Sequence, residues 1–341
     1  MIRERWYAIL EAKKVKNKPV GIKRMGADLV LWRGPSGEIV CMPDRCSHRG
    51  SVLNTGRIEG SCLECPFHGF QFDEEGHCRL IPANGKDKPV PRAFDLHTYV
   101  TREEHGFIWL WWGRRRDELP ALPWFDEIPS TTANSHTIIL QWDVSFERVM
   151  ENMLDMHHFP FLHRKVRPQP GTLIDPFHAE IEGDVITIWG NLRPDNRKSV
   201  DEAPGVPFKT SVHFPGMMIM ALTPKLRLLG ACVPVDENST WLAFRYYQSY
   251  IKAPVIGKIL AWISAYLELK LVHPDDERLL GTVEPQHPTM GSYRLIHADK
   301  GIGLWLRHVH KQTRQDSLVL SEAEVTAGLN GREKHVHSST S

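Results

Sequence analysis

The sequence has no excess of charge of either sign, no long apolar run and few cysteines. Lys and Arg together number 42 and Asp and Glu 41, which gives a formal net charge of +1. A chain with this balance has no global positive field to hold nucleic acid or anionic lipid, so we expect no nucleic-acid partner. Within the apolar stretch 255–272, only Ile259 to Leu267 is uninterrupted by charge. That run is too short for a transmembrane segment of about 20 residues.

The N-terminal segment and the cysteine content both favour the cytoplasm. The segment MIRERWYAILEAKK lacks the apolar core and cleavage site of a secretory signal peptide. The six cysteines are too few for a disulfide scaffold. These absences predict a cytoplasmic protein in a reducing environment.

The 341 residues suggest about two domains. Short β-rich runs separated by turns predict an all-β domain over 1–116. Three prolines mark 117–135 as a linker, so 136–312 forms the second domain and the polar segment 313–341 a tail. In the second domain we expect strands at 184–192, 211–222, 226–235 and 240–248, a helix over 255–272 and a strand pair within 292–309.

Two loops in the first domain each carry one cysteine and one histidine. One residue separates Cys46 from His48, and two residues separate Cys65 from His68. Sixteen residues lie between the two pairs. A [2Fe–2S] cluster with two thiolates on one iron and two imidazoles on the other has a higher reduction potential than a cluster held by four cysteines. The two loops predict such a cluster. The alternative is a zinc site, but zinc fingers pair Cys with Cys and His with His. We interpret the remaining cysteines of this domain as packing residues: Cys41, Cys62 and Cys78.

A second group of potential metal ligands lies in the second domain. The apolar spacing predicts a helix from Ser145 to about His158, which would place Asp155 and His158 on one face. His163 follows the break at Pro160. Two histidines and one carboxylate make the facial triad that holds Fe(II) and leaves positions open for dioxygen. Three acidic residues compete for the carboxylate: Asp275, Asp276 and Glu277.

Both motifs, in this order, resemble the oxygenase component of Rieske non-heme iron oxygenases, of the α-only type with monooxygenases and demethylases. The resemblance covers roughly residues 5–312 and includes an Asn-x₂-Asp-x₂-His-x₄-His segment, here Asn152, Asp155, His158 and His163. It implies an α+β fold: an N-terminal all-β Rieske domain, then an antiparallel-sheet, helix-grip (START-like) catalytic domain.

The resemblance also implies the roles of individual residues. It implies that Cys46, His48, Cys65 and His68 hold the cluster, and it places the third iron ligand on Asp276, with Asp275 as the alternative. It assigns catalytic roles to Asn152 and Asp155. Asp155 would join the iron-bound histidine to the cluster histidine of a neighbouring subunit, by position His68, in a head-to-tail homotrimer.

The function implied is that of a terminal oxygenase with dioxygen as co-substrate. No Gly-x-Gly-x-x-Gly fingerprint follows a strand, so electrons from NAD(P)H would arrive only through a separate reductase or ferredoxin. Met218, Met220, Phe244 and Tyr247 could line a pocket, which would favour a bulky apolar or aromatic small molecule. The helix over 255–272 could cap that pocket.

Two other functions account for parts of the pattern. One is a Rieske-type electron carrier whose C-terminal domain only binds a partner. The other is a structural protein with two zinc ions. The His158, His163 and Asp276 set argues against the carrier, because a carrier needs no second iron.

Overall fold

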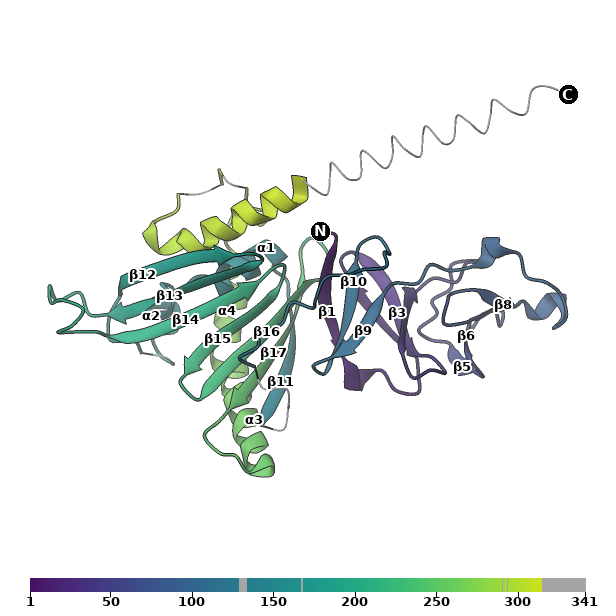
Figure 1. Ribbon diagram of the computed structural model, residues 1–341, viewed down its shortest axis with the longest axis horizontal. Helices are drawn as coiled ribbons and strands as arrows, with labels where there is room; N and C mark the ends of the chain where they lie inside the picture. The colour runs from purple at the N-terminus through teal and green to yellow at the C-terminus, as the bar shows by residue number, and fades with distance from the viewer. Residues whose placement is uncertain (129–133, 167, 290, 293, 315–341) are drawn as a thin grey trace, which may run out of the picture.

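The computed structural model describes residues 1–128, 134–166, 168–289, 291–292 and 294–314. The chain forms an N-terminal β domain and a C-terminal domain built on one large sheet, which lie side by side along the long axis (Figure 1). The expected α+β arrangement is therefore confirmed. In the part of the chain that the structure describes, no helix is both long and apolar enough to cross a membrane.

The N-terminal domain consists of three small antiparallel sheets. Their strand orders are β1(Arg5–Glu11)-β10(Phe107–Trp112)-β9(Thr101–Glu104), β2(Val20–Arg24)-β3(Ala27–Arg33)-β4(Ile39–Pro43) and β5(Arg57–Glu59)-β6(Cys62–Glu64)-β7(Gln71–Phe72)-β8(Cys78–Leu80). Short 3₁₀ turns lie at Ala12–Lys14, Pro82–Asn84 and Arg92–Phe94. Strand β10 is apolar and buried at every position, as expected for a strand covered on both faces. The four-stranded sheet lies at the end remote from the C-terminal domain (Figure 1).

The C-terminal domain is a seven-stranded antiparallel sheet with helices on one face. The strand order is β11(Ser135–Trp142)-β17(Thr240–Gln248)-β16(Leu226–Pro234)-β15(Met217–Thr223)-β14(Val206–His213)-β13(Val185–Arg193)-β12(Leu173–Glu182). The helices are α1(Phe146–Met153), α2(Phe159–Leu162), α3(Pro254–Leu271), α4(His273–Leu280) and a last helix over 300–314, preceded by the 3₁₀ turn His297–Asp299.

The large sheet is buried on both faces, and strand alternation explains how. Met218 and Met220 of β15 join the core beneath the helices. Met217 and Ile219 of the same strand join a core shared with β1 and β10 of the N-terminal domain. Because successive side chains in a strand point to opposite faces, one sheet is a common wall for both domains.

The expected strand pair within 292–309 is wrong, because this region forms the helix over 300–314. Ile302, Trp305 and Leu306 are buried at spacings of three and one, which is helical periodicity. Trp305 packs on Phe146 of α1 with ring centroids 6.2 Å apart. The span 211–222, expected as one strand, is two: β14 ends at His213 and β15 begins at Met217.

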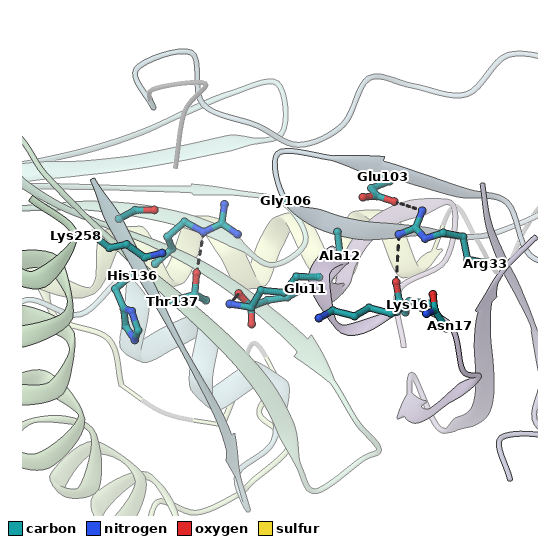
Figure 2. Close-up of a pocket in the computed structure, with 14 residues that line it drawn as sticks. Glu11, Ala12, Lys16, Asn17, Arg33, Glu103, Gly106, His136, Thr137 and Lys258 are labelled. Carbon is teal, nitrogen blue, oxygen red and sulfur yellow. Dashed lines mark hydrogen bonds and ion pairs between the residues drawn. The ribbon is translucent and has the colours of Figure 1, made fainter. Parts of the chain in front are cut away.

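Arg245 of β17 connects the two domains. Its side chain is buried, its Nη1 donates to the His105 carbonyl oxygen at 2.6 Å, and its guanidinium lies 4.1 Å from the Phe107 ring centroid. Nε donates to Thr137 Oγ1 at 2.9 Å. Arg245 and Thr137 also line a cavity of about 700 Å³ between the domains, in which Figure 2 labels Thr137.

We expect Arg245→Met to lower the free energy of unfolding by about 2–3 kcal/mol, since it removes charged hydrogen bonds and leaves a carbonyl without its donor. Arg227→Met is the matched control. Arg227 pairs with Glu127 at the surface, with side-chain exposures of 37% and 41%, so its loss should cost less than about 1 kcal/mol. Thermal unfolding of the two variants checks this. Equal midpoints would contradict the role of Arg245.

Candidate metal centres

The two cysteine–histidine loops have similar backbones. Gly50 N–H donates to the Cys46 carbonyl oxygen at 2.9 Å, and Gly69 N–H donates to the Cys65 carbonyl oxygen at 3.0 Å. Both glycines have positive φ, +72° and +73°, which glycine adopts without a Cβ clash. Each loop therefore turns back tightly and presents its cysteine and histidine on the same side.

The thiols of this group are buried and its imidazoles are exposed. Cys46 and Cys65 are 4% and 2% exposed, whereas His48 and His68 lie at the surface. The two imidazole rings contact each other edge to face with centroids 4.7 Å apart. Burial raises the pKa of Cys46 to about 11, so a thiolate here depends on a nearby cation.

The ligand atoms of the four side chains do not all lie close to a single point. This spacing distinguishes a two-iron cluster from a single zinc ion. A tetrahedral zinc ion with bonds of about 2.0–2.3 Å would hold four ligand atoms within about 4 Å of one another. Among the described residues, the one group of three or more potential ligand atoms within 4.8 Å of each other is elsewhere, in the C-terminal domain. A buried thiol pair beside an exposed imidazole pair fits a two-iron cluster better than one zinc ion.

The remaining cysteines of the N-terminal domain lie in its packed interior. Cys41, Cys62 and Cys78 are all buried and free. Burial raises the pKa of each of the three thiols. Neutral thiols in an apolar setting behave as small hydrophobic groups.

The predicted helix over 145–158 ends five residues early. Helix α1 stops at Met153. Oδ1 of Asp155 accepts from the backbone N–H groups of His157 at 2.9 Å and His158 at 3.3 Å. An Asp side chain that bonds its own backbone two residues on favours a turn over a helix. This turn, rather than a shared helix face, brings Asp155 next to His158.

Pro160 also acts differently from expectation. It lies in the first turn of the short helix α2, where its missing N–H would have no helical partner in any case. His158 and His163 flank α2 at its two ends. One helical turn therefore sets the separation of the two imidazoles, whose ring centroids are 5.2 Å apart.

His158, His163 and Asp276 form the group of potential ligands in the C-terminal domain. Asp276 Oδ1 lies 3.0 Å from His163 Nε2 and 3.8 Å from His158 Nε2. His163 and Asp276 are 1% and 5% exposed. Two imidazole nitrogens and one carboxylate oxygen on one side of a buried point are the donor set of a facial triad, so the residues fit Fe(II).

Of the three acidic residues that compete for the carboxylate, only Asp276 belongs to this group. Asp275 is 39% exposed and pairs with Arg278 Nη2 at 3.0 Å on the outer side of α4. Glu277 is partly exposed and is absent from the group. A helix turns by about 100° per residue, which explains why neighbours in sequence face different ways.

Asp155 lies behind His158. Its Oδ2 is 3.3 Å from His158 Nδ1, the ring nitrogen opposite the one that faces Asp276. Burial opposes ionisation of this carboxyl, but the adjacent His158 imidazole outweighs the effect of burial, so the pKa of Asp155 falls below its usual value. The carboxylate is therefore placed to fix the tautomer and orientation of the imidazole.

Two histidines near this group were not singled out from the sequence. His157 Nε2 lies 2.9 Å from Asp299 Oδ1, which ties the turn to the 3₁₀ segment before the last helix. The hydrogen bond to Asp299 raises the pKa of His157. His273 is buried, with its Nε2 2.9 Å from Tyr246 Oη. His273 precedes Asp276 by three residues, a helical spacing that could have marked it.

A small cavity of about 40 Å³ is lined by two of the three candidate ligands, His158 and Asp276. Asn152, Met218, Met220 and Phe244 line it. Tyr247 does not: it packs in the core shared with the N-terminal domain, because residues three apart in a strand point to opposite faces.

Comparison with known proteins identifies both domains. Residues 5–99 match the Rieske [2Fe-2S] domain, and residues 142–311 match the vanillate O-demethylase oxygenase C-terminal domain. Aminopyrrolnitrin oxygenase of Pseudomonas fluorescens is 34% identical over 168 residues, or 46% of this chain and 45% of that protein. Methylxanthine N1-demethylase of Pseudomonas putida is 36% identical over 171 residues, or 48% of this chain and 44% of that protein.

Solved structures share the fold of both domains. Dicamba monooxygenase bound to dicamba superposes with a TM-score of 0.70 at 20% identity, covering 93% of this chain and 99% of that one. Pseudomonas putida CBB5 NdmA superposes with a TM-score of 0.70 at 22% identity, covering 91% and 92%. The chain spans less than half the length of the two curated relatives that it matches in sequence.

Proposed function

Since this chain belongs to the Rieske non-heme iron oxygenases, we propose that it is the terminal oxygenase component of such a system. It uses dioxygen and electrons from a separate reductase or ferredoxin to hydroxylate or oxidatively demethylate a small molecule. The observation that carries this proposal is the buried His158–His163–Asp276 group beside a cavity, in a chain that also has a Rieske domain. An electron carrier would need only the Rieske domain.

Each metal group has its own residues in the proposal. Cys46, His48, Cys65 and His68 hold the [2Fe–2S] cluster, and His158, His163 and Asp276 hold Fe(II). When bound, the cluster supplies single electrons and the iron supplies dioxygen activation. The protein fixes the His158 ring through Asp155, and it keeps water away by burying His163 and Asp276. Asn152 lines the cavity, where it can contact substrate.

The substrate in this proposal is an apolar or aromatic molecule. Methionine and phenylalanine side chains form much of the cavity wall: Met153, Met218, Met220, Phe159 and Phe244. Apolar lining with a few polar groups is typical of sites for such ligands. The relatives named above act on an aminopyrrolnitrin and a methylxanthine by their names, and both names fit this class.

A head-to-tail homotrimer belongs to the same proposal. The sheet β5–β8 and helices α2 and α4 lie toward opposite ends of the chain (Figure 1). The exposed His68 is therefore available to a neighbouring subunit, where it would approach Asp155. We assign residues 1–116 to the Rieske domain, 117–135 to the linker and 136–312 to the catalytic domain, in a cytoplasmic protein.

Metal analysis of anaerobically purified protein tests the proposal. About three irons and two acid-labile sulfides per chain, with a Rieske-type electron paramagnetic resonance signal after reduction, are expected. Substrate-dependent oxygen uptake with an added reductase should follow. About two irons, unchanged after Fe(II) is added, would instead favour the electron carrier, and zinc without sulfide would overturn both functions.

A further inference from the structure

Helix α3 turns large apolar side chains toward solvent. Six of them are between 41% and 74% exposed: Val255, Ile256, Ile259, Trp262, Ile263 and Tyr266. We call these six residues the α3 outer face. They follow helical spacing over about three turns, so they form one continuous surface.

The inner side of α3 explains this orientation. The buried residues of the helix are Gly257, Ala261 and Ala265, and the helix packs on β11 and β17. A Cβ on Gly257 would lie 2.3 Å from Asn134 Oδ1 and 2.5 Å from Gln248 Nε2. At Gly257 a larger side chain would clash, and the three small residues let the helix approach the sheet closely while the six large ones point outward. A helix that is apolar all round normally has both sides covered.

Three exposed lysines border the α3 outer face. Lys252, Lys258 and Lys270 are exposed at its start, flank and end, and Lys258 borders the interdomain cavity (Figure 2). Glu268 is the one acidic residue of α3, and it lines the cavity beside the candidate iron ligands. The overall charge of +1 therefore conceals a local surface of apolar and cationic groups.

The aromatic residues complete the pattern. Trp262 and Tyr266 stack with ring centroids 5.8 Å apart in the middle of the face, and Lys270 Nζ lies 5.9 Å from the Tyr266 ring centroid. Aromatic and aliphatic side chains bordered by lysines are typical of helices that lie in a membrane interface. A symmetric contact of this face with itself would instead bring lysines against lysines, with no acidic side chain on the face to pair with them.

We propose that the α3 outer face binds the surface of an anionic lipid bilayer. The six apolar side chains enter the boundary between headgroups and acyl chains, and the lysines contact lipid phosphates. The attachment is peripheral, in agreement with the finding that no described helix could cross a membrane. Glu268 and Val272, on the inner side of the same helix region, wall the metal-site cavity. If the proposed oxygenase function holds, an apolar substrate dissolved in lipid would be adjacent to that cavity.

Vesicle flotation of the full-length, cluster-containing protein tests this proposal without any measurement of turnover. We expect the protein to float with phosphatidylcholine vesicles that contain phosphatidylglycerol, and to float less with phosphatidylcholine alone or at high salt. The double variant Ile259→Glu with Ile263→Glu should reduce binding about tenfold or more, since charge replaces two inserted side chains.

The matched control carries the same change of charge away from α3. Ile181 and Val206 are 36% and 47% exposed on β12 and β14, so Ile181→Glu with Val206→Glu should bind as the unmodified protein does. A second variant, Lys258→Gln with Lys270→Gln, keeps the apolar surface and should lose the preference for phosphatidylglycerol.

Three results would overturn the proposal. The first is an unmodified protein that stays with the unbound fraction for both kinds of vesicle. The second is equal loss of binding in the α3 variant and its control. The third is a smaller oligomer for the α3 variant in the absence of vesicles, which would assign the face to contact between subunits. Because binding is read directly, these results are independent of whether the protein proves to be an oxygenase.

Discussion

Asp155→Asn is expected to lower turnover about 100-fold, the upper end of what altering the group behind a metal-binding histidine costs, while both metal groups stay bound. The ligand atoms of His158, His163 and Asp276 are unchanged by this substitution. What changes is the group behind His158, where a carboxylate oxygen now lies 3.3 Å from Nδ1.

The physical reason is that Asn cannot replace both oxygens of Asp155. Oδ1 accepts from two backbone N–H groups, and Oδ2 faces His158 Nδ1. If the Asn oxygen keeps the backbone bonds, its NH₂ group opposes the protonated Nδ1 of an imidazole bound through Nε2. If the amide flips, the NH₂ group opposes the backbone donors. Either orientation sets donor against donor.

Two readouts separate this role from a general loss of structure. Iron and sulfide content should equal those of the unmodified protein, whereas reoxidation of the pre-reduced cluster in the presence of substrate and dioxygen should slow. Asp299→Asn is the matched control, because Asp299 bonds the adjacent His157 instead. Wild-type reoxidation in the Asp155 variant would refute the proposed link between the two sites.

The sequence allowed the chemistry to be predicted further than the geometry. The Cys46–His48 and Cys65–His68 pairs are recognisable because each lies within one short loop, where spacing alone sets which side chains can meet. The contact between Asp155 and His158 was also expected, but for the wrong reason. A helix was predicted where the Asp155 side chain, by accepting two backbone hydrogen bonds, forms a turn.

The predictions that were wrong concern features that depend on packing between distant segments. The helix over 300–314 packs Trp305 on α1 and His308 on Phe214, both far away in the sequence. A short apolar run does not distinguish a strand from a buried helix. Tyr247 and Phe244 looked equivalent until the N-terminal domain was seen to cover the second face of the sheet. By contrast, Asp276 was named correctly, but only through the family resemblance: the residues alone left Asp275, Asp276 and Glu277 open, because they do not contain the direction of α4.

The pair Asp275 and Asp276 therefore gives the sharpest test of the proposed iron site. Asp276→Ala should reduce iron from about three to about two per chain and turnover to background, because two neutral imidazoles remain where a facial triad needs a carboxylate. Asp275→Ala removes the same group one residue earlier, where it only pairs with Arg278 at the surface. That variant should keep its iron and its activity, since exposed ion pairs contribute about 1 kcal/mol or less.

Sulfide content and the reduced-state resonance signal act as internal controls, because Asp276 belongs to a different domain from the cluster loops. Both quantities should be unchanged in both variants. Loss of iron in the Asp275 variant with retention in the Asp276 variant would transfer the ligand role to Asp275. Retention in both would mean that the 3.0 Å contact between His163 Nε2 and Asp276 Oδ1 is a buried hydrogen bond and nothing more. Both substitutions remove one carboxylate from the same turn of α4, and the two carboxylates point in different directions. A difference in iron content between the variants therefore shows which carboxylate points toward the iron.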